Sequence, residues 1–267
     1  MSALVTVADP LAPVRATLRA MAEQPGQPPV NGLVPGLLVD DTEGWVPATA
    51  LVTGEALDDL LDTAKQRWNA APHAAAALAW KSYTYWLALP AVLGYAAARR
   101  VPLLRPEGVL ARWSPRRPFV TIGLTSVEVA VLPSDPLALA GIGAGLVGSV
   151  RVVPDEDELL RVLRTSLMDD HLAPILEHIK SRLHLGRRTL WGSLASGIAH
   201  GVSYAADVAP GPTLETAYRI LTALGIDDLV ELAEREDGLP GLTVNRRTCC
   251  LAFTLPEPKI CVGCCIR

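Results

Sequence analysis

The sequence predicts an α+β fold, with a mainly helical body, a small antiparallel sheet and a compact C-terminal segment. Three observations predict it. Apolar residues recur at helical spacing over long stretches on both sides of the centre of the chain. Short β-branched stretches separated by proline occupy the centre itself. All five cysteines of the 267-residue chain lie between positions 249 and 265.

The N-terminal part is expected to contain two helices after an irregular start. Residues 1 to 50 are rich in Pro and Gly, which favour turns and loops, so we expect mostly irregular connections there. Apolar residues at helical spacing predict one helix over 55–69 and a second over 74–100. Pro90 lacks a backbone N–H and crowds the preceding turn, so the second helix is expected to kink or end early.

The centre of the chain is expected to form the sheet. The stretches 109–113, 119–125 and 127–132 are short, β-branched or alternating, and they are separated by Pro or Ser. They predict two or three antiparallel strands. Small residues dominate 133–149, which we expect to be a loop.

Helical spacing returns from Asp155 onward. Positions 155–157 are acidic, and negative charge is favourable at the start of a helix. Asp169 or Asp170 is expected to cap a further helix that runs through residue 183. Gly225 is expected to end another helix as its C-cap. The remaining helices are predicted over 188–204, 213–224 and 227–235.

Composition argues against several classes of function. Charged residues make up 19 % of the chain and the formal net charge is −4, so there is no basic footprint for nucleic acid. Residues 1–20 lack a basic stretch followed by an apolar run, which argues against a signal peptide. The apolar stretches 86–98 and 137–150 are shorter than the roughly 20 residues that a bilayer requires. We therefore expect a cytoplasmic protein without a transmembrane segment.

The cysteines predict a metal centre, because clustered thiols in a reducing compartment usually bind metal rather than form disulfides. Cys249 and Cys250 are adjacent, whereas two residues separate Cys261 from Cys264. Four thiolates satisfy either one tetrahedral Zn²⁺ or the two irons of a [2Fe–2S] cluster. Adjacent side chains diverge, so the Cys-Cys pair favours the wider two-metal target. A non-enzymatic zinc module for structure or interaction stays open as the alternative.

The C-terminal pattern resembles that of a known family. It reads C-C-x10-C-x2-C, with Arg-Arg-Thr before it, an aromatic residue three positions after the second cysteine and a proline three positions later. This is similar to the FhuF-type ferric siderophore reductase family, and the similarity covers positions 246–267. A weaker similarity extends to Leu190-Trp191-Gly192. The matching positions of the pattern are Arg246, Arg247, Cys249, Cys250, Phe253, Pro256, Cys261 and Cys264.

The resemblance implies a cofactor and a function. In that family the cysteines bind a [2Fe–2S] cluster that passes one electron to a ferric siderophore in the cytoplasm, and Fe(II) is released. The ligands implied here are Cys249, Cys250, Cys261 and Cys264. No catalytic residue beyond the cluster is implied. The expected partners are a ferric siderophore of the hydroxamate type and an electron donor such as a ferredoxin or a ferredoxin reductase. The chain then divides into a siderophore-binding body, 1–240, and a cluster-binding segment, 241–267.

Several neighbours of the cysteines are candidates for tuning the cluster or contacting the substrate. Arg246 and Arg247 place positive charge beside the thiols, either to tune the reduction potential or as a solvated rim. Phe253 stands where the family has Tyr. Cys265 is an extra thiol that could replace Cys264 as a ligand.

Substrate contacts in the body are less specified by the sequence. We expect the siderophore to lie between the C-terminal segment and a cleft of the helical body. Trp191, Ser193 and Ser196 are candidates to face that cleft. A Trp near the start of a helix is, however, more often part of the core.

Overall fold

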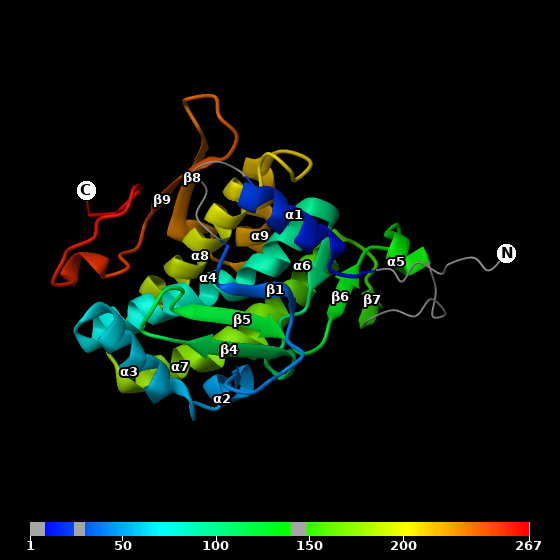
Figure 1. Ribbon diagram of the computed structural model, residues 1–267. Coiled ribbons are helices and arrows are strands. Elements are labelled where there is room, and N and C mark those ends of the chain that lie inside the picture. Colours follow the sequence, from blue (N-terminus) through cyan, green and yellow to red (C-terminus); the bar gives the residue numbers. More distant parts are fainter. Residues whose placement is uncertain (1–8, 24–29, 140–147, 267) are drawn as a thin grey trace.

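The computed structural model describes residues 9–23, 30–139 and 148–266, and it confirms the α+β prediction. Helices form most of the molecule and three small sheets surround them (Figure 1). The central element is helix α4 (Pro72–Ala98), most of whose residues are buried. Helix α8 (Arg187–Tyr204) packs along α4, and it confirms the helix predicted over 188–204.

The sheets combine parallel and antiparallel pairs. In the first sheet β1 pairs parallel with β5, β5 pairs antiparallel with β4, and β4 pairs antiparallel with β2. In the second, β6 pairs antiparallel with β3 and parallel with β7. The third is the antiparallel pair of β8 and β9. The strands are β1 (Leu33–Leu38), β2 (Val46–Pro47), β3 (Arg100–Pro102), β4 (Val109–Trp113), β5 (Val120–Leu124), β6 (Glu128–Val131), β7 (Ser149–Val152), β8 (Val230–Glu234) and β9 (Leu242–Arg246).

The strands predicted at the centre of the chain are present. The antiparallel register of β4 and β5 places Ala111 opposite Ile122. The third stretch forms β6, which lies in the second sheet. The predicted loop over 133–149 contains a short helix, α5 (Pro136–Leu139), and positions 140–147 of that prediction lie outside the described residues.

The prediction of a mostly irregular start is wrong for much of residues 1–50. This stretch contains helix α1 (Ala12–Glu23), strands β1 and β2, and the start of helix α2 (Ala48–Val52). Val14, Thr17 and Met21 are buried on one face of α1, at the spacing that a packed helix requires. Packing of this short face outweighs the turn-forming tendency of the Pro and Gly residues around it.

Helix α3 (Leu57–Trp68) confirms the prediction over 55–69, and α4 confirms the helix predicted over 74–100. Helix α4 does not end early but continues through Pro90 to residue 98. Leu89, Pro90 and Ala91 are all buried. Burial of apolar surface on all sides of α4 therefore outweighs the one backbone hydrogen bond that proline removes.

The helical stretch after residue 155 is longer than predicted. It begins as expected, because the Asp155 carboxylate accepts a hydrogen bond from the Glu158 N–H at 2.8 Å. The prediction that Asp169 or Asp170 begins a new helix is wrong. Both residues lie inside an unbroken helical stretch, in which Leu167, Met168 and His171 are buried while Asp169 and Asp170 are exposed. The stretch comprises α6 (Glu156–Arg164), a π-helical segment (Thr165–Leu172) and α7 (Ala173–Arg182).

The end of the body contains one confirmed and one wrong prediction. Helix α9 (Thr213–Leu224) ends at Gly225, whose φ of 69° is the left-handed C-cap conformation. The helix predicted over 227–235 is wrong, because a 3₁₀ turn (Asp227–Leu229) leads directly into β8. In β8 Val230 and Leu232 are buried and Glu231 between them is exposed. That alternation has the period of a strand.

Among the described residues, no helix combines the length and the apolar character that a membrane span needs.

Candidate metal centre and adjoining cavity

Backbone hydrogen bonds hold the C-terminal segment (residues 241–267) against the body. Its first part is β9, which pairs with β8. Directly after β9 the chain folds back, so that the Arg246 N–H donates to the Gly263 carbonyl at 2.8 Å. The Arg247 N–H donates to the Leu229 carbonyl at 3.0 Å. Residues 247–265, which contain all five cysteines and which we call the cysteine loop, are therefore fixed to the end of β9 near both of their ends.

Glycine allows close approach at two places around this loop. A Cβ added to Gly192 of α8 would lie 1.8 Å from Thr248 Oγ1, directly before the first cysteine. Gly263 has a φ of 74°, and a Cβ there would lie 2.1 Å from the Val244 carbonyl oxygen. Any larger residue at either position would push the cysteine loop away from its support.

A small apolar cluster also binds the segment to the body. Cys250, Ala252 and Leu255 are buried against Leu78 of α4, and Trp68 at the end of α3 packs against the same cluster. Figure 1 shows the C-terminal segment beside this end of α4. The cysteine loop is thus docked on the body through side chains as well as through its backbone.

The thiols of the segment lie close enough to interact electrostatically. Burial raises the pKa of Cys261, and negative charge on Cys250 and Cys264 raises it further. Burial also raises the pKa of Cys265, as does charge on Cys249 and Cys264. All five thiols therefore belong to one group of interacting side chains.

Backbone groups and cations surround these thiols. The Cys249 sulfur accepts a hydrogen bond from the Leu251 N–H at 3.3 Å. Burial by itself raises the pKa of Cys250, but a backbone hydrogen bond from Ala252 and the positive charges of Lys81 and Arg246 outweigh burial, and the pKa is lowered. Positive surroundings of this kind favour thiolate, the form that binds metal.

The donor set fits the predicted metal chemistry, although the side chains do not form a closed ligand sphere. In the part of the chain that the structure describes, no group of three or more His, Cys, Asp or Glu side chains is arranged to hold a metal ion. The two cysteine pairs nonetheless meet, because the Cys250 and Cys261 side chains share a hydrogen bond. Four thiols are the donors of a [2Fe–2S] cluster or of a structural zinc. Cys249, Cys250, Cys261 and Cys264 are the residues that would hold either one.

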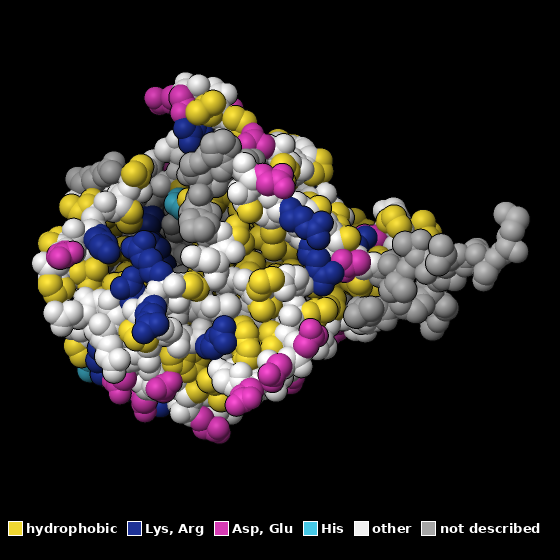
Figure 2. Space-filling model, in the orientation of Figure 1, with side chains coloured by type: hydrophobic (Ala, Val, Ile, Leu, Met, Phe, Trp, Pro, Cys, Tyr) yellow, Lys and Arg dark blue, Asp and Glu magenta, His cyan; other side chains and the backbone are white. Residues whose placement is uncertain are grey.

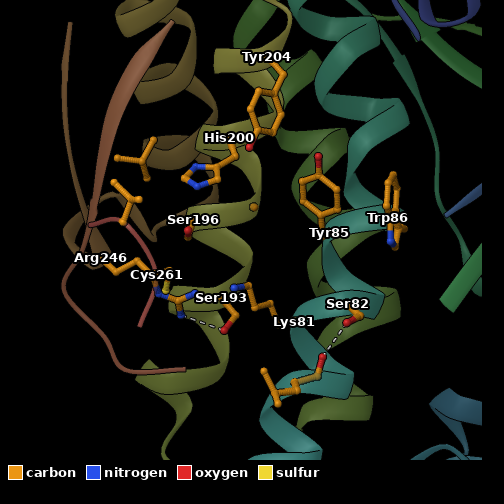
Figure 3. A pocket seen from close by; sticks show the side chains of 14 residues that line it. Lys81, Ser82, Tyr85, Trp86, Ser193, Ser196, His200, Tyr204, Arg246 and Cys261 are labelled. Atoms are coloured by element: carbon orange, nitrogen blue, oxygen red, sulfur yellow. Dashed lines mark hydrogen bonds between the residues drawn. The ribbon is translucent and has the colours of Figure 1, made fainter. Parts of the chain in front are cut away.

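A cavity of about 390 Å³ adjoins the cysteine loop (Figure 3). It lies between α4, α8 and the C-terminal segment, and we call it the α4–α8 cavity. Its volume is within the range of pockets that bind small molecules. The lining residues are Leu78, Lys81, Ser82, Tyr85 and Trp86 of α4; Ser193, Ser196, Gly197, His200 and Tyr204 of α8; and Val244, Arg246, Cys261 and Val262 of the C-terminal segment.

Polar side chains in the cavity carry protons that they can share with a ligand. Burial raises the pKa of Tyr85, and the neighbouring Tyr204 raises it further. Burial likewise raises the pKa of Tyr204. Burial lowers the pKa of His200 to about 4, with Lys81 and Arg246 adding to the effect. Near pH 7 both phenols are therefore neutral donors and His200 is an uncharged imidazole.

The structure brings some of the sequence-predicted site residues together with this cavity. Arg246 lines it, and its Nη2 donates to Ser193 Oγ at 3.0 Å, the bond drawn beside the cavity in Figure 3. Ser196 lines it too. Cys261 is the thiol that contributes to the wall.

The other candidates lie elsewhere. Trp191 is partly buried against Trp80, with ring centroids 5.7 Å apart, and it faces away from the cavity towards α7. Arg247 is exposed and lies 3.9 Å from the Glu231 carboxylate. Phe253 is 40 % exposed on a 3₁₀ turn (Ala252–Thr254).

Sequence reasoning missed most of the residues that α4 and α8 contribute. In α8 the polar positions 193, 196, 200 and 204 follow one another at intervals of three and four within a mostly buried helix. That spacing places them on one face. Such a polar stripe is the signal that would have indicated a lined cavity.

In comparisons with known proteins, no protein-family model matches the chain, and no curated protein matches it significantly.

Proposed function

We propose that this protein is a cytoplasmic ferric siderophore reductase of the FhuF type that its C-terminal motif resembles. One electron would convert Fe(III) of the bound siderophore to Fe(II). The observation that carries the proposal is that Cys261, one of the four motif cysteines, forms part of the wall of the α4–α8 cavity. A substrate in that cavity would lie next to the metal-binding loop, as one-electron transfer requires.

The chemistry of siderophores explains why one electron is sufficient. Their hard oxygen donors bind Fe(III) much more strongly than the softer Fe(II), so reduction weakens the complex. Bound to the four cysteines, a [2Fe–2S] cluster supplies electrons one at a time. The electron would come from a ferredoxin or a ferredoxin reductase, and the reduced donor would be the species oxidised overall.

The residues of the chain have separate parts in this proposal. Tyr85, Tyr204 and Ser196 would donate hydrogen bonds to oxygen atoms of the siderophore, and Trp86 would cover its apolar backbone. Arg246 would act on both the cluster and the substrate, because its positive charge lowers the pKa of Cys250 and its side chain lines the cavity. A positive charge favours the reduced, more negative form of a thiolate-bound cluster.

The outer face of the loop would receive the electron. Outside the cavity lining, Arg247, Lys259 and Ile260 of this segment are exposed. Exposed apolar side chains next to basic ones suit a short-lived contact with an acidic redox protein. We propose this face as the docking site of the electron donor.

Single-turnover mixing tests the reductase. The full chain is purified without air, reduced with a chemical reductant that is then removed, and mixed with a ferric trihydroxamate in the presence of a chelator that traps Fe(II). We expect reoxidation of the protein and trapped Fe(II) in equal amounts.

The matched control is the gallium complex of the same trihydroxamate, which cannot accept the electron and must leave the protein reduced. A reduced protein that stays unchanged across a panel of ferric hydroxamates would overturn the proposed activity.

A zinc module is the second candidate, favoured by one observation. The Cys264 N–H donates to the Cys261 carbonyl at 3.2 Å, so the C-x2-C half forms a tight turn of the kind that zinc sites also use. In that case the chain would have a structural or interaction role, and purified protein would contain zinc and no sulfide.

A further inference from the structure

Two cationic side chains line the α4–α8 cavity. Its cationic lining residues are Lys81 and Arg246, and the lining residues that the structure describes include no Asp or Glu. His200 adds no negative charge and is neutral near pH 7. Figure 2 shows Lys and Arg side chains gathered around a hollow on the face that carries the C-terminal segment. The lining side chains other than the Cys261 thiol therefore carry net positive charge, although the whole chain has a formal net charge of −4.

One side-chain nitrogen of Arg246 has no hydrogen-bond partner among the described residues. The residue is only 6 % exposed. Its Nε donates to the Thr248 carbonyl at 3.2 Å and its Nη2 donates to Ser193 Oγ at 3.0 Å. Nη1 is buried and has no hydrogen-bond partner among the described residues.

A buried donor on a charged group is unfavourable while it stays unpaired, because it has lost its water without gaining an acceptor. The bonds at Nε and Nη2 fix the plane of the guanidinium, so Nη1 points in one direction. Because Nη1 is closed to solvent, a ligand in the cavity would meet the positive charge of the guanidinium group rather than this nitrogen.

We propose that the α4–α8 cavity is an anion subsite that selects negatively charged ferric complexes through the positive charges of Lys81 and Arg246 in its lining. The inference rests on the proposed function, since it takes the ligand to be a siderophore complex. Among complexes with the same metal core, a negative one gains attraction to the two cations. A positive one meets like charge in a partly enclosed cavity.

Redox-inert complexes separate binding from electron transfer. One linear trihydroxamate is prepared as its gallium(III) complex in three forms: with a free amine, which makes it cationic, with the amine acetylated, which makes it neutral, and with the amine succinylated, which makes it anionic. Binding of each to the full chain is measured by calorimetry at low and high salt. We expect affinity to fall from anionic to neutral to cationic, by about tenfold across the series at low salt and by less at high salt.

Two variants assign the selectivity to the cavity. Lys81→Gln and Arg246→Gln remove one positive charge each. Each is expected to reduce the ratio of the affinities for the anionic and the cationic complex several-fold. The matched controls are Lys65→Gln and Arg188→Gln, since both side chains are exposed and paired with carboxylates outside the cavity. Because Arg246 is buried and Arg246→Gln can unfold, Lys81→Gln alone decides the question if that happens.

The outcomes distinguish the inference from the reductase activity. Equal affinity for the three complexes, tighter binding of the cationic one, no binding of any, or a difference that Lys81→Gln leaves unchanged would overturn the anion subsite. Charge-ordered binding without any reduction of the ferric complexes would keep the subsite and remove the reductase. Reduction of ferric complexes without an order of affinity by charge would keep the reductase and remove the anion subsite.

Discussion

His171 is fully buried and keeps a hydrogen bond at each ring nitrogen. Its Nδ1 lies 2.6 Å from the Leu104 carbonyl and its Nε2 lies 2.6 Å from the Tyr83 hydroxyl. A carbonyl can only accept, so Nδ1 carries the proton and Nε2 accepts from Tyr83. Protonation at Nε2 would leave the Tyr83 hydroxyl facing a second donor. This histidine is a core residue rather than a metal ligand.

Acid should therefore destabilise the fold through His171. Burial lowers its pKa from 6.5 to about 4, against smaller opposing effects of Leu104 and Glu107. Between those two pH values His171 is protonated in the unfolded chain but not in the folded chain. The free energy of unfolding therefore falls as pH decreases from 6.5 towards about 4. The loss reaches at most about 3 kcal/mol.

Urea unfolding at several pH values across that window measures the effect. In His171→Gln the dependence on pH should be weaker, even though the variant is less stable at neutral pH. His184→Gln is the matched control, because His184 is exposed, and it should keep the full dependence. If the free energy of unfolding changed equally with pH in wild type and in His171→Gln, protonation of His171 would not be linked to folding.

Helix α8 connects the body to the cysteine loop. One face packs on α4, another lines the cavity, and Gly192 lies against Thr248. The Leu190-Trp191-Gly192 step therefore has a structural meaning. Trp80 Nε1 donates to the Leu190 carbonyl at 2.8 Å, Trp191 packs on Trp80, and Gly192 lets the loop approach.

Gly192→Ala should loosen the cysteine loop. The new Cβ would overlap Thr248 Oγ1, and overpacking of this kind costs roughly 1–3 kcal/mol. Gly197→Ala is the matched control on the same helix, since its Cβ would first meet Tyr85 at 3.4 Å, an ordinary contact. We expect Gly192→Ala to lower both the melting temperature and the metal content, and Gly197→Ala to lower neither.

The two glycine variants also show what would contradict this view of α8. If Gly192→Ala retained metal and stability as well as Gly197→Ala, the contact with Thr248 would not be what docks the loop.

At the level of elements, long periodic stretches could be predicted and weakly patterned ones could not. The helices over 55–69 and 188–204 have an unambiguous period or clear boundaries, and both are confirmed. Strand β8 was mistaken for a helix because five residues are too few to separate period two from period 3.6. The continuous helix through Asp169 and Asp170 depends on burial in the folded molecule, which local capping preferences do not contain.

At the level of the molecule, the cysteines and Arg246 could be identified in the sequence because they lie together in one short motif. The cavity could not. Its lining residues come from α4, α8 and the C-terminal segment, which are far apart in the chain. Lys81 and Arg246 line one cavity only because α8 packs both on α4 and on β9. A single cation on a buried helix carries no signal of its own. For that reason, of the cavity's walls in the helical body the sequence indicates only Ser193 and Ser196 of α8.

Anaerobic analysis of iron, acid-labile sulfide and zinc per chain, in wild type, Cys264→Ser and Cys265→Ser, shows whether the cysteines hold a [2Fe–2S] cluster. We expect two irons and two sulfides in wild type and Cys265→Ser, because the proposed [2Fe–2S] cluster takes its four thiolates from Cys249, Cys250, Cys261 and Cys264. Cys264→Ser should lose both. Zinc without sulfide in the wild type, or a cluster that survives Cys264→Ser and is lost in Cys265→Ser, would contradict this expectation.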